Sequence, residues 1–278
     1  MMTRSRALAS AAAVCALWVG TAQGKAPFIV LACTTSTENS GLLDALLPTF
    51  TEATGVGVRV VAKGTGQAIR IAANGDADVL LVHHTPSEER FVAEGHGVAR
   101  HDIMYNDFVI VGPRSDPAGV RGLSAATTAF ERIAKAEAAF ASRGDDSGTH
   151  KRELELWKET DVDVRAASGT WYRETGSGMG ATLNVAQAMG AYALSDRATW
   201  LHFANKHDLE LLLEGDPPLL NQYGIILVDV RRHPNVRSAE ARSFVDWMLS
   251  PDGQQRIGAY SIDGQPVFFP NAAGSDPR

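Results

Sequence analysis

The sequence has few of the features that mark several large classes of protein. Its 278 residues include 2 cysteines, while the 12 prolines and 26 glycines are ordinary numbers for this length. These numbers exclude a disulfide-stapled scaffold and a collagen-like repeat, and a hydrophobic share of 45% excludes a disordered chain. A formal net charge of -6 argues against wholesale binding of nucleic acid, which needs a basic surface. A chain of this length forms one large domain or two modest ones, and a small ligand held by local groups suits it best.

A long apolar run occurs at the N-terminus. Arg4 and Arg6 precede the apolar residues 7–20, and the small residues Ala22 and Gly24 stand at the positions that a signal peptidase reads. This pattern predicts a signal peptide over residues 1–24 and a mature protein in the periplasm. Because the run is too short to cross a bilayer, we expect no stable membrane insertion. Its removal would take away two arginines and no acid, which changes the formal net charge from -6 to -8.

Cys33 is the one cysteine that remains after this cleavage, so no internal disulfide is expected. An alternative is a lipoprotein, with lipid attached at Cys33 after Val30, Leu31 and Ala32. Lys25 and Pro27 interrupt the apolar run before this position, which disfavours that alternative.

Apolar runs of strand length alternate with segments of helical period along the rest of the chain. This pattern is typical of an α/β protein with mostly parallel sheets flanked by helices. We expect strands at 28–32, 56–61, 79–82, 107–112, 138–142, 191–194 and 225–228. The Gly- and Pro-rich stretch 112–117 indicates a crossing into a second lobe, and strand 225–228 a return to the first. The predicted domains are 25–112 for the first part of lobe I, 113–225 for lobe II and 226–278 for the return of lobe I.

Four short segments rich in Gly, Ser and Thr each follow a predicted strand and precede a predicted helix. The segments are 34–37, 64–66, 143–149 and 175–178. A helix start offers unpaired backbone N–H groups and the positive end of the helix dipole, and hydroxyl groups add donors without bulk. Two segments in each lobe therefore predict an oxyanion site in the cleft between the lobes. The candidate ligand-binding residues are Thr34, Thr35, Ser36, Thr65, Gly66, Arg143, Ser147, Thr149, Gly176 and Ser177.

Arg143 is the strong cation in these segments, and its fork of donors suits a tetrahedral oxyanion. A structural ion pair with Asp145 or Asp146 is the alternative role, and both roles can hold together. We expect these two carboxylates to orient Arg143 or to cap the next helix, with neither facing the ligand. The histidines have poor spacing for a metal site: His83 and His84 are adjacent and so point to opposite faces of a strand. No metal site and no cofactor are expected.

Seven stretches of the chain together resemble the periplasmic tungstate-binding proteins of bacterial ABC transporters. The stretches are 32–40, 64–67, 74–83, 104–113, 142–151, 176–182 and 192–201. The resemblance implies a type II periplasmic binding protein, in which two lobes close on a tetrahedral oxyanion that is delivered to a membrane permease. It also implies that Thr34, Ser36, Arg143 and Thr149 contact the anion. The family's threonine-rich signature has Thr where this chain has Cys33, so a side-chain contact there is not implied.

The resemblance leaves alternatives open. Molybdate has nearly the size and shape of tungstate, and the sequence does not rank the two anions. Phosphate keeps a proton near neutral pH and needs an acceptor carboxylate, which Asp145 or Asp146 could supply. From another class, an exported serine hydrolase could use Ser36 or Ser147 as nucleophile, although neither has an evident base partner in the sequence. The favoured expectation is a monomeric tungstate receptor without enzymatic activity.

Overall fold

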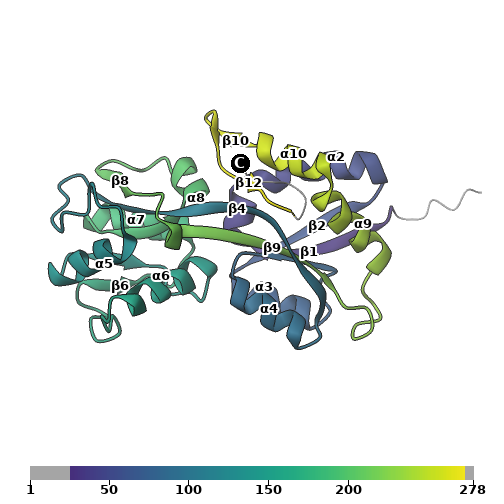
Figure 1. Cartoon of the computed structure of the whole chain (residues 1–278), viewed down its shortest axis with the longest axis horizontal. Helices are drawn as coiled ribbons and strands as arrows, with labels where there is room; N and C mark the ends of the chain where they lie inside the picture. Colours follow the sequence, from purple (N-terminus) through teal and green to yellow (C-terminus); the bar gives the residue numbers. More distant parts are fainter. Residues whose placement is uncertain (1–25, 273–278) are drawn as a thin grey trace, which may run out of the picture.

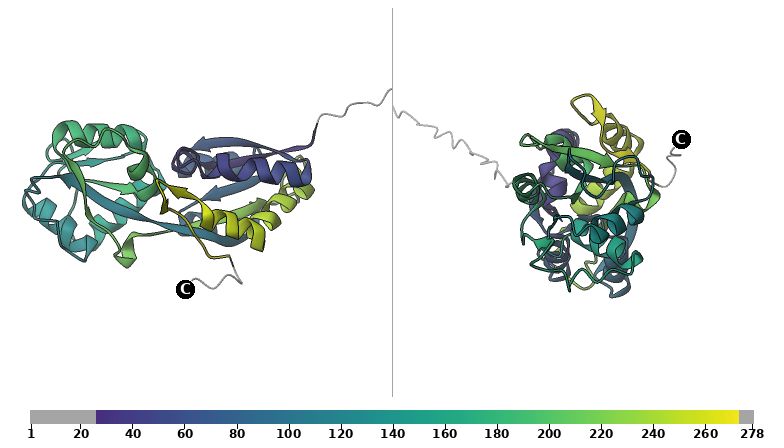
Figure 2. Two further views of the ribbon diagram at one scale, coloured as in Figure 1. Left: turned by 90° about the horizontal axis from the view of Figure 1, so that it is seen from above. Right: turned by 90° about the vertical axis from the view of Figure 1, so that its left-hand side faces the viewer.

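A computed structural model describes residues 26–272, so the predicted signal peptide lies outside the described residues. The chain folds into two lobes that lie side by side along the longest axis (Figures 1 and 2). The expected α/β, two-lobed architecture is confirmed. Both lobes consist of β-sheet covered by helices, as the alternation of apolar runs and helical segments predicted.

The sheet of lobe I is built around β1 (Phe28–Thr34). Its neighbours β2 (Gly57–Lys63) and β3 (Val79–Val82) both run parallel to it. All four residues of β3 are buried, because helices cover both faces of this sheet. The carboxyl ends of these three strands therefore meet at one edge of lobe I.

Helices cover the two faces of this sheet (Figure 1). On one face lie α2 (Leu42–Thr54), α9 (Ser238–Leu249) and α10 (Pro251–Ala259), and on the other lie α3 (Thr65–Ala73) and α4 (Thr85–Ala93). Pro48 lies inside α2, which continues on both sides of it. The short elements of this lobe are α1 (Thr35–Asn39), β10 (Ser261–Ile262), β11 (Gln265–Pro266) and β12 (Phe269–Pro270).

Two long strands connect the lobes. β4 (Gly97–Pro113) and β9 (Leu220–Val228) pair antiparallel to each other, and β9 also pairs antiparallel to β3. We expected shorter strands, at 107–112 and 225–228, and the polar residues Arg100, His101 and Asp102 of β4 lie outside the expected range. These residues lie on a paired backbone whose side chains partly face solvent, so the pairing does not need an apolar run.

The strands that pair with β4 change along its length, and the change marks where the chain passes from lobe I to lobe II. β4 pairs with β9 up to Asp107, and from Phe108 onward it pairs antiparallel with β7 (Ala193–Asp196) and β8 (Leu209–Leu213) of lobe II. The pairs of the crossing are thus antiparallel, while β1, β2 and β3 are parallel. The sheets are therefore mixed and not mostly parallel as expected, because the two strands that cross between the lobes run antiparallel to their neighbours. The predicted domain bounds 25–112, 113–225 and 226–278 stay a prediction.

Lobe II has its own apolar core around Phe130, Phe140 and Trp157. Its other strands, β5 (Phe140–Ser142) and β6 (Tyr172–Glu174), run parallel to each other. The remaining elements are α5 (Ala126–Lys135), α6 (Gly148–Glu159), α7 (Met179–Met189), α8 (Arg197–His202) and a 3₁₀ turn, η1 (Pro217–Leu219).

Cys33 lies in β1 between two parallel neighbours and is fully buried. Burial raises the pKa of its thiol to about 12. Lipid attachment at Cys33 would require the chain to begin there, which would delete the first five residues of the central strand. The fold therefore contradicts the lipoprotein alternative.

Candidate oxyanion site between the lobes

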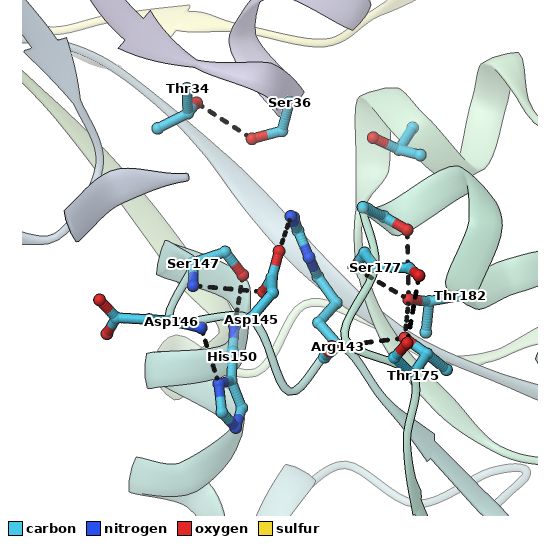
Figure 3. Close-up of polar contacts among 12 residues, drawn as sticks. Thr34, Ser36, Arg143, Asp145, Asp146, Ser147, His150, Thr175, Ser177 and Thr182 are labelled. Atoms are coloured by element: carbon cyan, nitrogen blue, oxygen red, sulfur yellow. Dashed lines mark hydrogen bonds and ion pairs between the residues drawn. The ribbon is translucent and has the colours of Figure 1, made fainter. Parts of the chain in front are cut away.

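The four predicted segments each lie at the beginning of a helix. Thr34, Gly64, Ser147 and Gly178 are the N-caps of α1, α3, α6 and α7. The first two helices belong to lobe I and the other two to lobe II. In Figure 3, Arg143 extends from lobe II toward Thr34 and Ser36 of lobe I. The structure thus brings the predicted Arg, Ser and Thr side chains of the two lobes to one cleft.

On the lobe I side, the hydroxyl groups of Thr34 and Ser36 lie 3.1 Å apart and are almost fully buried. The Thr34 hydroxyl has further neighbours: it accepts a hydrogen bond from the Thr37 amide at 3.2 Å and lies 2.7 Å from the Thr37 hydroxyl. Thr34 thus caps α1, and its hydrogen-bonding capacity is used largely within lobe I. The Ser36 hydroxyl has fewer neighbours and more capacity for a ligand.

His83, which follows β3 directly, is a residue of this site that sequence reasoning missed. Its Nε2 atom lies 3.2 Å from both Thr34 Oγ1 and Ser36 Oγ, and its Nδ1 atom lies 3.0 Å from Asn221 Oδ1. Burial, and to a lesser extent the charges of Arg143 and His84, lowers the pKa of His83 to about 4. The imidazole is therefore neutral at physiological pH in the empty site.

The sequence contained one signal for His83. His83 stands at the carboxyl end of a buried apolar strand, as do the Thr34 and Arg143 segments. The prediction that His83 and His84 point to opposite faces of a strand is wrong, because β3 ends at Val82 and both side chains line one cavity. His84 is the N-cap of α4, and its Nε2 atom lies 3.3 Å from Glu155 Oε1 of α6.

On the lobe II side, Arg143 directly follows β5 and is 3% exposed. Its Nη2 atom donates to Asp145 Oδ2 at 2.5 Å, and Asp145 Oδ1 accepts from the Ser147 amide at 3.2 Å. Asp145 therefore orients the guanidinium and supports the start of α6, as expected. Asp146 is exposed, and its carboxylate pairs with Lys151 at 3.2 Å.

Six buried side-chain polar atoms have no hydrogen-bond partner among residues 26–272, and three of them belong to the predicted site residues: Thr65 Oγ1, Thr149 Oγ1 and Arg143 Nε. Thr65 lies in the first turn of α3 in lobe I, and Thr149 in the first turn of α6 in lobe II. A buried polar group without a partner costs about 1–3 kcal/mol, so such groups call for an explanation. Hydroxyl and guanidinium donors at two helix starts, with the dipoles of those helices, fit an anion with several acceptor oxygens.

The start of α6 lies close to Thr65 and His83 across the cleft. A β-carbon on Gly148 of α6 would lie 3.2 Å from Thr65 Oγ1 and 2.7 Å from the His83 ring. The absence of a side chain at position 148 thus lets the start of α6 approach lobe I. A cavity of about 320 Å³ adjoins this contact, lined among others by His83, Gly148 and Asn221.

The other predicted residues lie less directly at the cleft. Thr35 is half-buried, and Gly66 lies beside the Asp146 carboxylate. Gly176 is exposed and has a left-handed φ of 62°, which turns the chain before α7. The Ser177 hydroxyl donates to the Thr175 carbonyl at 3.1 Å. The Ser147 hydroxyl accepts from the His150 amide at 3.2 Å, so it caps α6.

Within residues 26–272, no cluster of three or more His, Cys, Asp or Glu side chains could hold a metal ion. In the same range, no helix is both long enough and apolar enough to span a bilayer.

A family model described as the PBP superfamily domain matches residues 20–252. The tungstate-binding protein TupA of Peptoclostridium acidaminophilum is 46% identical over 249 residues, which cover 88% of this chain and 86% of that protein. The chain belongs to the TupA family of the PBP superfamily. Among solved structures, the tungstate-binding TupA of Desulfovibrio alaskensis G20 matches with a TM-score of 0.78 and 45% identity, covering 89% of this chain and 100% of that one. A tungstate ABC transporter structure from Geobacter sulfurreducens matches with a TM-score of 0.77 and 45% identity, covering 84% and 98%. The resemblance seen in the sequence is thereby confirmed.

Proposed function

We propose that this TupA-family chain is a tungstate receptor that works outside the cytoplasmic membrane and delivers the anion to an ABC transporter permease. The relatives named above are tungstate-binding proteins or part of a tungstate transporter. The observation that carries the proposal is the set of three buried donors without partners, Thr65 Oγ1, Thr149 Oγ1 and Arg143 Nε. In this function the receptor needs no cofactor, performs no catalysis, is exported by residues 1–24 and acts as a monomer.

The chemistry of the cleft favours an anion that only accepts hydrogen bonds. Tungstate and molybdate are dianions without a proton, so a set of donors satisfies them. Phosphate would present a hydroxyl group that needs an acceptor, and each oxygen of Asp145 already accepts one hydrogen bond within lobe II, from Arg143 or from the Ser147 amide, which holds this carboxylate in the role of orienting Arg143. The same geometry therefore disfavours phosphate and accepts molybdate as the second ligand.

The test is titration calorimetry of the mature protein with tungstate, molybdate, sulfate and phosphate, supported by thermal shifts. A ligand present at 1,000 times its Kd stabilises the folded protein by roughly 4 kcal/mol. We expect one-to-one binding of tungstate, weaker or equal binding of molybdate, and little response to the other two. Sulfate or phosphate binding as tightly as tungstate would overturn the assignment.

One observation favours a second candidate, an exported serine hydrolase. Contrary to the expectation from sequence, Ser36 does have a base partner: His83 Nε2 lies 3.2 Å from Ser36 Oγ, and Asn221 orients the ring. A lowered pKa near 4 makes this imidazole a weak base, however, and Nε2 is equally close to Thr34. Turnover of a chromogenic ester by the wild-type protein but not by Ser36→Ala would support the hydrolase and contradict a pure receptor.

A further inference from the structure

The side chains described so far carry too little net positive charge to balance a bound dianion. Arg143 carries the positive charge on the lobe II side, but Asp145 pairs with it. Asp196, the fully buried N-cap of α8, also interacts electrostatically with Arg143; burial raises the pKa of its carboxyl, and the Arg143 charge opposes that shift. A dianion that enters this cleft therefore meets helix dipoles and hydroxyl donors but little net positive charge. Any group there that can gain a proton will gain it more readily once the anion is bound.

The hydrogen bonds of His83 determine which of its ring nitrogens can gain a proton. Asn221 Nδ2 donates to Asn106 Oδ1 at 2.7 Å, which turns the Asn221 oxygen toward His83. An amide oxygen only accepts, so Nδ1 of His83 carries the hydrogen of the neutral ring. Nε2 is then the bare nitrogen, and it faces Thr34 Oγ1 and Ser36 Oγ.

The triangle formed by Nε2, Thr34 Oγ1 and Ser36 Oγ has two hydrogens while His83 is neutral. The bare Nε2 must accept one of the two hydroxyl hydrogens, which takes that hydrogen away from a ligand. When Nε2 is protonated, it donates to a hydroxyl oxygen instead. The hydroxyl hydrogen that the bare Nε2 had accepted is then released, and the Ser36 hydroxyl, which has fewer neighbours in lobe I, can direct its hydrogen to the anion.

We propose that His83 is the second cation of the oxyanion site: it is neutral while the cleft is empty and takes up a proton from solvent, at Nε2, when the dianion binds. The inference rests on the proposed function and names a positioning residue for it. His83 acts through the hydroxyl groups of Thr34 and Ser36, and its charge balances the dianion together with Arg143.

The surroundings of His83 explain why the ring is neutral without ligand. Burial disfavours the charged form of His83, and so do the charges of Arg143 and His84. The centroid of the His83 ring lies 4.8 Å from that of Tyr223 and 6.5 Å from that of Phe108. Arg152 and Glu155 of α6 line the adjoining cavity, but Glu155 is bound by Arg152 and His84. The side-chain hydrogen bonds of the ring within residues 26–272 are to Ser36, Asn221 and Thr34, and none of them involves a carboxylate. A bound dianion therefore supplies the negative charge that shifts the protonation equilibrium of His83.

The test is tungstate titration calorimetry at pH 7 in several buffers with different ionisation enthalpies. The dependence of the observed enthalpy on the buffer gives the number of protons taken up. We expect roughly 0.5–1 proton per anion at pH 7, and therefore a Kd that rises about three- to tenfold per pH unit around pH 7 and levels off above the pKa of the complex. His83→Gln keeps a polar group near the position of Nε2 but cannot gain charge. It should abolish the uptake and weaken binding about ten- to hundredfold at pH 7, with little pH dependence.

His101→Gln is the matched control, because it removes an exposed histidine of β4 that does not line this cavity, and it should leave the proton uptake unchanged. His83→Asn, which can still bond to Asn221, serves as a second variant if His83→Gln folds poorly. Tight tungstate binding without proton uptake, or uptake that persists in His83→Gln, would overturn the role of His83 and leave the receptor assignment intact. Absence of tungstate binding to the wild-type protein would instead reject the proposed function.

Discussion

Gly148 of lobe II lies against the imidazole ring of His83 in lobe I, so closely that a β-carbon at position 148 would stand 2.7 Å from His83 Cε1. The backbone φ of Gly148 is not in the left-handed region, so the constraint here is space and not conformation. The contact exists only while the two lobes are close together.

Gly148→Ala should therefore hinder closure of the cleft and weaken tungstate binding by at least about tenfold, while the melting temperature of the empty protein changes little. Calorimetry and thermal denaturation of the variant check this. Gly178→Ala is the control, because Gly178 is also the N-cap of a helix but has no atom within 4 Å of an added β-carbon. Equal affinity loss in both variants would show that closure is not the cause.

Thr65→Val and Thr149→Val remove the two hydroxyl groups that have no partner among the described residues. Each should weaken tungstate binding about tenfold, and the empty protein should keep or gain stability, because a buried unsatisfied group is lost. Thr182→Val makes the contrast: its hydroxyl lies 2.8 Å from that of Thr175, so this change should lower the melting temperature. A large loss of stability in Thr65→Val or Thr149→Val, with unchanged affinity, would remove that residue from the site.

Arg143→Lys should weaken binding roughly ten- to hundredfold, and Arg143→Ala more, because a guanidinium gives two parallel charged hydrogen bonds and an ammonium acts as a point charge. Loss of one charge-assisted bond is worth about 1.5–3 kcal/mol. Both affinities and both melting temperatures without ligand are measured side by side, with the exposed Arg173→Ala as control. A purely structural role predicts a large loss of stability and only a secondary loss of binding.

Glu153 of α6 is buried in lobe II, where it accepts a hydrogen bond from the Tyr172 hydroxyl at 2.6 Å. Burial raises the pKa of its carboxyl from 4.5 to about 8. The folded state thus holds the proton more tightly than the unfolded state. The stabilising effect of protonation is fully present below about pH 4.5 and is lost as the pH rises toward 8.

Glu153→Gln should remove this dependence. The difference in unfolding free energy between Glu153→Gln and the wild type should grow in favour of the variant by on the order of 2–4 kcal/mol from pH 4.5 to pH 8. Urea denaturation across this range measures it. Taking the difference between the two proteins cancels the contribution of Glu88, whose raised pKa acts in the same direction. A difference that stays constant with pH would contradict the buried, protonated carboxyl.

The sequence allowed the fold class, the lobe II loop and the lobe I residues Thr34, Ser36 and Thr65 to be predicted, because these depend on local signals. Arg143, Asp145 and Ser147 lie within one loop, and their contacts follow from short-range chemistry. His83 and Asn221 could not be found in this way, since 138 positions separate them and only the pairing of β9 with β3 brings them together. The length of β4 was missed for a related reason, because its polar half is stabilised by backbone pairing that side-chain patterns do not show.

The two connections between the lobes are strands of one antiparallel ribbon, β4 and β9, and the register of this ribbon shifts within residues 97–104. A two-stranded ribbon can bend and twist while its ladder of hydrogen bonds stays intact. Opening of the receptor can therefore bend this ribbon without breaking its ladder of hydrogen bonds. The relative position of the two lobes then depends on whether tungstate is bound. A membrane partner that touches both lobes could therefore distinguish the two states of the receptor without contacting the tungstate.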